Sequence, residues 1–166
     1  MNRSKYRAIP TAESIGAGAR PDGSVTTEPS WTSFVEFTVE GKPIPKGRPR
    51  FTKSGHVYTP GQTLTFENAV KRKAAGVMLT RQPFKGPVWV QVEAVMAPPK
   101  KLTRDYPSVR PDLDNIVKAV TDALNGICFD DDAQIISLRA WKIYGDRPET
   151  RVTVGPVLVP VPQGAA

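Results

Sequence analysis

The sequence contains a single cysteine, Cys128, and a single histidine, His56. One thiol forms no intrachain disulfide and no cysteine-rich zinc site, and it suits a reducing compartment. Ser-His-Asp, Cys-His and two-histidine zinc sites would all depend on the one histidine. If the protein is an enzyme, we therefore expect carboxylates, lysine or metal-bound water to carry its proton transfers.

Long apolar runs are also missing from the chain. No run approaches the roughly 18 residues that a membrane span needs, and the N-terminus lacks the apolar core of a signal peptide. These absences predict a cytoplasmic protein without a membrane partner. The length of 166 residues suits one domain that can bury a core.

Acidic residues are outnumbered overall but locally concentrated, and the formal net charge is +7. Residues 34–82 hold nine Lys and Arg against three Glu, whereas residues 112–132 hold six Asp against one Lys. The basic excess fits a polyanionic partner such as nucleic acid, or it only keeps the surface soluble. The acidic cluster is either a metal site or a solvated loop.

The order of the predicted elements defines a fold class. Residues 1–32 lack apolar periodicity and predict a flexible arm, followed by a folded domain over 33–157 and a frayed tail over 158–166. Helical spacing predicts one helix from Pro60, capped by Thr59, to about Thr80, and another over 114–124 that Gly126 ends. Alternation predicts strands over 34–41, 86–97, 135–145 and 150–159, with a short strand candidate over 56–59. This order predicts a single-domain α/β fold, a mixed sheet packed with two main helices.

The stretch "RPDLDN", residues 110–115, places two carboxylates at the start of the second predicted helix. Asp112 lies just before the helix and Asp114 sits at its cap or first turn. One aspartate there can accept bonds from free backbone N–H groups, but capping does not explain both. Asp114, Lys118 and Asp122 recur every four residues, so they share a helix face that is either a surface ion-pair ladder or the wall of a site.

Three consecutive aspartates, Asp130, Asp131 and Asp132, precede the strand predicted from residue 135. Like charges this close repel one another, so the alternative to a site is a solvated turn rich in turn-forming residues. Mg²⁺ prefers oxygen ligands and keeps several waters, and it would give both acidic segments one purpose if folding brings them together. Magnesium held in this way can activate water and stabilise a reacting phosphodiester, with Lys118 beside it.

Two stretches resemble the RusA family of Holliday junction resolvases. The central one, "RPDLDNIVKAVTDALNGICFDDDAQI" at residues 110–135, has D-x-D-N, a lysine four residues after the second aspartate, a helix ending in D-A-L, and a D-D-x-Q run. The stretch "GKPIPKGRPRFTKSGHVYTP", residues 41–60, is similar to the opening of many members. The resemblance covers about residues 34–155.

The resemblance implies a homodimeric, Mg²⁺-dependent endonuclease that nicks two opposed strands of a four-way DNA junction symmetrically. Such enzymes act in DNA recombination and repair, and members occur in bacteria and prophages. The implied catalytic residues are Asp112, Asp114, Lys118 and Asp132. The implied metal ligands are Asp112, Asp114, Asp132 and Asp131. Because this chain carries Asp130 as an extra acid, the metal-binding position in the triplet stays open by one residue.

Charge alone predicts which residues contact DNA. They lie in the basic loop after the first strand and on the first helix, and they are Lys46, Arg48, Arg50, Lys53, Lys71, Arg72 and Lys73. For the three helical residues the alternative is a solvated helix face. We expect His56 in a turn or strand, and Trp89 and Trp141 in the core or on a sheet face rather than stacked on bases.

Two other functions fit part of this pattern. A non-catalytic basic nucleic-acid-binding protein would use the aspartates only for caps and turns, and would bind without cleaving. A phosphatase of the haloacid dehalogenase type needs its D-x-D at a strand end, whereas here the D-x-D opens a helix in a short chain. We therefore predict the endonuclease.

Overall fold

The computed structural model describes residues 34–48, 50–51, 57–58 and 60–157. The predicted arm and tail lie outside these residues, as do Lys53 and His56, so the domain boundaries stay predictions. The elements in chain order are β1 (Val35–Glu40), β2 (Arg50–Phe51), β3 (Val57–Tyr58), α1 (Gly61–Val77), β4 (Val88–Met96), α2 (Leu113–Leu124), the 3₁₀ helix η3 (Asp132–Gln134), β5 (Ile135–Tyr144) and β6 (Glu149–Pro156).

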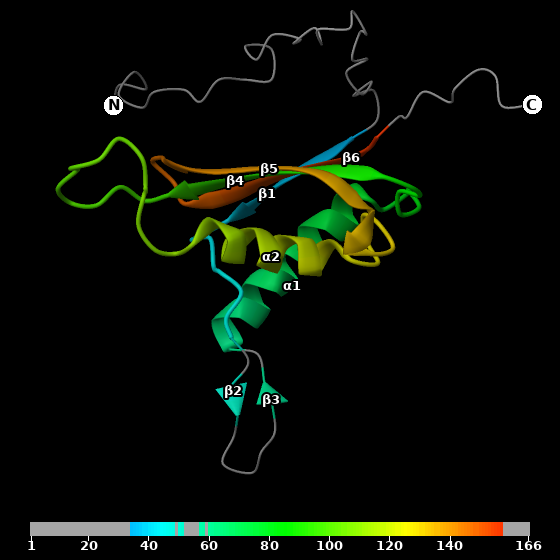
Figure 1. Cartoon of the computed structure of the whole chain (residues 1–166), viewed down its shortest axis with the longest axis horizontal. Coiled ribbons are helices and arrows are strands. Elements are labelled where there is room, and N and C mark those ends of the chain that lie inside the picture. The colour runs from blue at the N-terminus through cyan, green and yellow to red at the C-terminus, as the bar shows by residue number, and fades with distance from the viewer. Residues whose placement is uncertain (1–33, 49, 52–56, 59, 158–166) are drawn as a thin grey trace, which may run out of the picture.

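One four-stranded sheet organises the fold, with the strand order β1-β6-β4-β5. β6 pairs antiparallel with β1 and β4, whereas β4 pairs parallel with β5. A parallel pair needs a crossover connection, and α2 lies in the segment that joins β4 to β5. The predicted α/β class, with a mixed sheet and two helices, is therefore confirmed. The short β2–β3 pair forms a separate two-stranded ladder below the helices (Figure 1).

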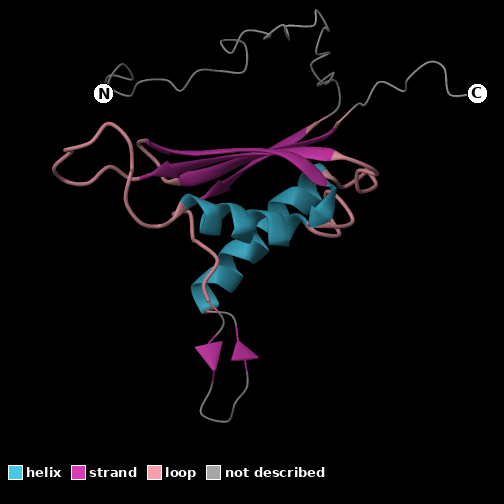
Figure 2. Cartoon of the chain, viewed as in Figure 1, coloured by secondary structure: helices cyan, strands magenta, loops and turns pink. Residues whose placement is uncertain are grey.

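Both helices pack on the same face of the sheet (Figure 2). The alternation expected in β1 buries Val35, Phe37 and Val39 against that layer. The helices contribute one apolar stripe each, because residues three and four apart share a face. The fully buried stripe residues include Val70 and Ala74 from α1 and Ile116, Val120 and Leu124 from α2.

The observed ends of the two helices agree only in part with those predicted from the sequence. Pro60 is the N-cap of α1 rather than its first helical residue, and the helix ends at Val77, three residues before the predicted end. Gly126, with φ of +73°, follows the end of α2 as predicted, since glycine adopts this left-handed conformation without a Cβ clash. Within the described ranges, neither helix combines the length and apolar content that a membrane crossing requires.

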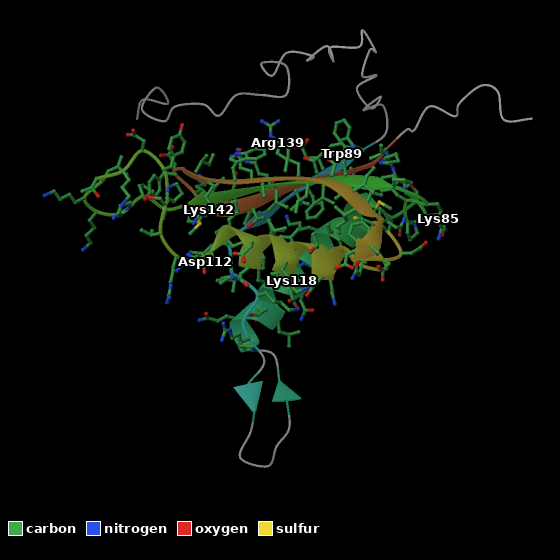
Figure 3. All side chains as sticks on the ribbon, viewed as in Figure 1. Lys85, Trp89, Asp112, Lys118, Arg139 and Lys142 are labelled. Carbon is green, nitrogen blue, oxygen red and sulfur yellow. The ribbon has the colours of Figure 1, made fainter. Side chains whose placement is uncertain are left out.

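No helix or strand among the described residues covers the opposite face of the sheet or its β5 edge. Trp141 donates a hydrogen bond to Glu93 (2.8 Å), and the guanidinium of Arg139 lies 5.3 Å from the centre of its ring. Trp89 and Arg139 rise from the face away from the helices (Figure 3). β5 is an edge strand of the described sheet, and it exposes Ile136 and Leu138 by 62% and 52%. The two tryptophans are thus sheet-face residues, and an apolar edge runs beside α2.

Candidate active site

The start of α2 presents two aspartates in different directions. Asp112 is the N-cap residue in extended conformation, and its side chain makes no capping hydrogen bond, so simple capping does not explain it. Asp114 lies in the first turn, where its carboxylate meets the positive end of the helix dipole. Asp112 faces a hollow shared with the start of α1, whereas Asp114 faces a hollow shared with β5. Figure 3 shows Asp112 at the N-terminal end of α2 and Lys118 farther along it.

The α2–β5 hollow, as we call it, brings the two predicted acidic segments together. It has a volume of about 730 Å³. Three charged side chains line it, namely Asp114 and Lys118 from α2 and Asp132 from η3. The rest of its wall is mostly apolar and comprises Leu113, Val117, Thr121, Ile135, Leu138 and Ala140. Two carboxylates and one ammonium group, from segments far apart in the sequence, therefore share one concave site.

The three consecutive aspartates have three different environments. Asp130 accepts a bidentate salt bridge from Lys85, at 2.7 and 2.8 Å. Asp131 caps η3 by accepting a hydrogen bond from the backbone N–H of Ala133 at 2.8 Å. The side chain of Asp132 makes no hydrogen bond or ion pair with the described part of the chain and lines the α2–β5 hollow. The structure thus singles out Asp132 as the member of the triplet that faces the site.

The side chain of Gln134 holds the backbone of the aspartate triplet in place. Its side-chain oxygen accepts hydrogen bonds from the backbone N–H groups of Asp130 and Asp131, at 2.8 and 3.0 Å. Its side-chain nitrogen donates to the carbonyl oxygens of Phe84 and Gly86, at 3.0 and 2.7 Å. With the Asp131 cap this forms a capping box, in which both side chains satisfy backbone N–H groups at the helix start. Gln134 thereby holds the backbone on which Asp132 sits.

An ion-pair network holds Lys118 beside the hollow. Asp122, one turn farther along α2, accepts from Lys118 at 3.1 Å and from Lys46 at 2.9 Å, and Lys46 also pairs with Glu67 of α1 at 2.6 Å. Burial acts to raise the pKa of Asp122, but the hydrogen bonds from Lys46 and Lys118 outweigh it, so the pKa lies below its ordinary value. Burial acts to lower the pKa of Lys46, but Glu67 and Asp122 outweigh it and the pKa is raised.

The remaining residues predicted from charge are dispersed. Lys46 is tied to two carboxylates, whereas Arg48 and the α1 residues Lys71, Arg72 and Lys73 are exposed. Arg50 lies in β2, where only its backbone is described, and Lys53 lies outside the described residues. Cys128 is fully buried, and burial raises the pKa of its thiol to about 12, as is typical of an inert structural cysteine.

Some residues of the site region carry no recognisable sequence signal. Lys142 of β5 donates hydrogen bonds to the carbonyl oxygens of Val109 and Pro111, at 2.7 and 2.9 Å, and so anchors the segment that leads to Asp112. Nothing local in a strand marks a lysine for such a role. Gln134, by contrast, stands three residues after Asp131, which is the capping-box spacing and could have been read from the sequence.

The donor set of the hollow suits magnesium. Mg²⁺ in phosphoryl-transfer sites is usually bound by one or two carboxylates, several waters and the phosphates of the substrate. Asp114 and Asp132 meet that requirement as the two carboxylates of the hollow. Among the residues that the structure describes, no three His, Cys, Asp or Glu side chains are grouped closely enough to form a larger ligand set. The metal roles predicted for Asp112, Asp114, Asp131 and Asp132 therefore stay predictions.

Comparison with known proteins adds an independent finding. The model of one family, described as endodeoxyribonuclease RusA, matches residues 40–155 of the chain. The chain is also similar to a protein of Bacillus subtilis (strain 168) described as the uncharacterized protein YqaN. The two are 31% identical over 138 residues, which cover 72% of this chain and 94% of the relative.

Proposed function

The chain belongs to the RusA family of Holliday junction endodeoxyribonucleases, and from that premise we propose that it resolves four-way DNA junctions by Mg²⁺-dependent, paired and symmetric nicks. Membership makes the protein a nuclease of the junction-resolving class. Beyond membership, we propose that the protein uses Mg²⁺, that its nicks are paired, and that it acts in DNA recombination and repair. The observation that supports this proposal is that Asp114, Lys118 and Asp132 line the same hollow, the α2–β5 hollow.

Each charged residue of the hollow has a different role in the proposed reaction. Asp114 and Asp132 would hold Mg²⁺, which when bound supplies Lewis acidity to the phosphodiester and its attacking water. Lys118 is placed to donate hydrogen bonds to the phosphate oxygens as negative charge grows on them. Asp122 orients the Lys118 ammonium group through the 3.1 Å ion pair. Val117 and Leu138 belong to the apolar part of the wall beside these three side chains.

A homodimer forms the second part of the proposal. A four-way junction has paired, symmetry-related strands, and a twofold dimer with one site per subunit would cut two of them. The exposed apolar residues Ile136 and Leu138 on the β5 edge support a second copy at this edge, because long apolar edge strands are normally covered. Leu138 also lines the α2–β5 hollow, so a neighbouring subunit there would lie next to the site.

One cleavage experiment with a matched control tests this function. A labelled four-way junction is incubated with Mg²⁺ and wild type, Asp114→Asn, Asp132→Asn or Asp130→Asn. We expect paired nicks from wild type and from Asp130→Asn, whose residue pairs with Lys85 outside the hollow, and loss of cleavage in the other two variants. Equal activity in all four proteins would refute the site, and salt-sensitive binding without any cleavage would favour a purely binding role.

A further inference from the structure

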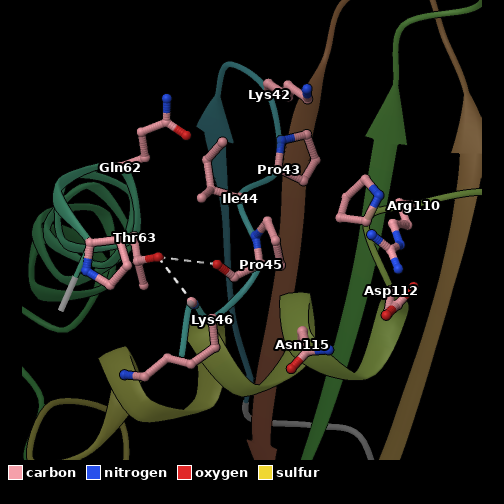
Figure 4. A pocket seen from close by; sticks show the side chains of 13 residues that line it. Lys42, Pro43, Ile44, Pro45, Lys46, Gln62, Thr63, Arg110, Asp112 and Asn115 are labelled. Atoms are coloured by element: carbon pink, nitrogen blue, oxygen red, sulfur yellow. Dashed lines mark hydrogen bonds between the residues drawn. The ribbon is translucent and has the colours of Figure 1, made fainter. Parts of the chain in front are cut away.

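Two adjoining hollows lie on the other side of the α2 start from Asp114. The helix-start hollow, of about 530 Å³, lies between the starts of α1 and α2 and is lined by the loop at 42–47 (Figure 4). The loop hollow, of about 360 Å³, lies between Met96 and the loop at 97–111. Lys42 and Arg110 line both hollows, and Arg104 lines the second one. We refer to the two hollows together as the cationic groove.

The described residues leave three positive charges of the groove without a partner. Lys42, Arg104 and Arg110 make no hydrogen bond or ion pair with the described residues, unlike Lys46, whose ammonium group already has two carboxylate partners. Asp112 is the one acidic side chain among the residues that line the two hollows. Three unpaired cations around a concave surface attract a polyanion, because the walls focus their field into the hollow.

The backbone that carries these cations is held in place. Lys142 binds the carbonyl oxygens on both sides of Arg110, those of Val109 and Pro111. Two backbone hydrogen bonds fix the ends of the segment with Lys42. The N–H of Gly41 donates to the carbonyl oxygen of Pro148 at 2.9 Å, and the N–H of Lys46 donates to the carbonyl oxygen of Asn115 at 2.7 Å. A cationic site on anchored backbone loses less conformational freedom when it binds a ligand.

The position of the groove relates it to the site of cleavage. Asp112 lines the groove and Asp114 lines the α2–β5 hollow, so the two sites meet at the first turn of one helix. A DNA strand whose phosphate reaches Lys118 would therefore continue past the start of α2 toward Arg110. We propose that the cationic groove binds the backbone phosphates of the cleaved DNA strand adjacent to the scissile phosphate. This inference rests on the proposed function, and it assigns contacts to three residues outside those predicted from charge.

Salt-dependent DNA binding tests the groove. Binding of a labelled four-way junction, and of a plain duplex of the same strand length, is measured by fluorescence anisotropy without divalent metal over a range of salt concentrations. Each phosphate contact contributes about one to the slope of log K against log salt. We expect Lys42→Gln, Arg104→Gln and Arg110→Gln each to reduce the slope by about one and to weaken binding by about three- to tenfold at moderate salt.

Controls separate loss of contact from loss of fold. Arg81→Gln removes one exposed cation beyond the far end of α1 and should leave the slope unchanged. Arg110→Lys retains the charge and should retain most of the slope, and circular dichroism melting confirms that each variant is folded. If all three Gln variants keep the wild-type slope, the groove does not bind DNA phosphates, even if the junction is still cleaved. Groove-dependent binding of both DNAs, without cleavage of the junction, would leave the groove standing and refute the proposed function.

Discussion

The ammonium nitrogen of Lys46 lies 2.9 Å from a carboxylate oxygen of Asp122, which joins the basic loop after β1 to the second helix. The same ammonium group reaches Glu67 of α1 at 2.6 Å, so one side chain connects three segments. Asp122 in turn pairs with Lys118, which lines the α2–β5 hollow. The residue that charge suggested as a DNA contact is therefore part of the framework of the site.

Removing the Lys46 ammonium group should destabilise the fold. Lys46→Met leaves Glu67, whose side chain is only 10% exposed, close to Asp122 without a cation between them. We expect the free energy of unfolding to fall by about 1–3 kcal/mol, the usual cost of leaving a charged, part-buried group without its partner. Urea unfolding measures it, and Lys42→Met, an exposed lysine of the same loop without an ion pair, should change stability by less than about 0.5 kcal/mol. Equal losses would contradict the role given to the network.

The Asp122 carboxylate should make stability sensitive to acid. Its pKa in the folded protein is lowered from the ordinary value of 3.8, so the unfolded state binds the proton first as the pH falls. The stability that this group contributes is present above about pH 4 and is lost as the pH falls through the lower, folded pKa. We expect Asp122→Asn to flatten the slope of unfolding free energy against pH in that window, and exposed Asp105→Asn to leave it unchanged. Urea unfolding at several acidic pH values measures these slopes. A slope in Asp122→Asn as steep as that of wild type would show that another group is responsible.

Lys118 should affect the reaction more than the binding of DNA. Lys118→Ala removes the donor that we propose acts on the reacting phosphate, and loss of one such donor typically slows catalysis by about 10²–10³-fold. Single-turnover cleavage at saturating protein gives the rate, and anisotropy without metal gives the affinity, which we expect to change far less. Lys118→Arg retains the positive charge and should recover part of the rate. A variant that loses rate and affinity equally would place Lys118 among the general DNA contacts.

Gln134 should control the position of Asp132. Gln134→Ala removes four hydrogen bonds that fix the backbone before η3. We expect a loss of about 1–3 kcal/mol in stability together with slower cleavage and a higher Mg²⁺ requirement, since Asp132 is no longer held. The exposed residue Gln82, which makes no such bonds, supplies the control variant Gln82→Ala. A variant that is destabilised but cleaves normally at the same Mg²⁺ concentration would limit Gln134 to a structural role.

The edge of β5 should determine the oligomeric state. Leu138→Glu places a charge on an apolar edge that we propose is covered by a second copy, so the protein should sediment as a monomer. Leu102→Glu is the matched control, because Leu102 is exposed to 51% and Leu138 to 52%, and Leu102 lies in the loop before α2. Analytical ultracentrifugation distinguishes the two outcomes. A wild type that sediments as a monomer at all concentrations would remove the dimer from the proposal.

The strands and helices could be predicted because each is governed by local periodicity. The alternation of Val35, Phe37 and Val39 and the helical spacing of Ile116, Val120 and Leu124 record which side chains face the core. The end of α1 was less predictable, since Val77 is 36% exposed while Met78, just beyond the helix, is buried. Apolar character alone does not say which of two adjacent residues turns inward at a helix end.

The sequence by itself determined the fold class, the acidic segments and the family to which they are similar, because these depend on residue type and spacing along the chain. Only the tertiary structure decided what each acid does. Asp130, Asp131 and Asp132 are identical in chemistry and adjacent in sequence, yet Asp130 pairs with Lys85, Asp131 caps η3 and Asp132 lines the α2–β5 hollow together with Lys118. The cap is local, since Ala133 lies two residues from Asp131, but Lys85 lies 45 residues from Asp130 in the chain. The side chains that line the hollow with Asp132 come from α2 and β5, so the packing of helices and strands sets these environments.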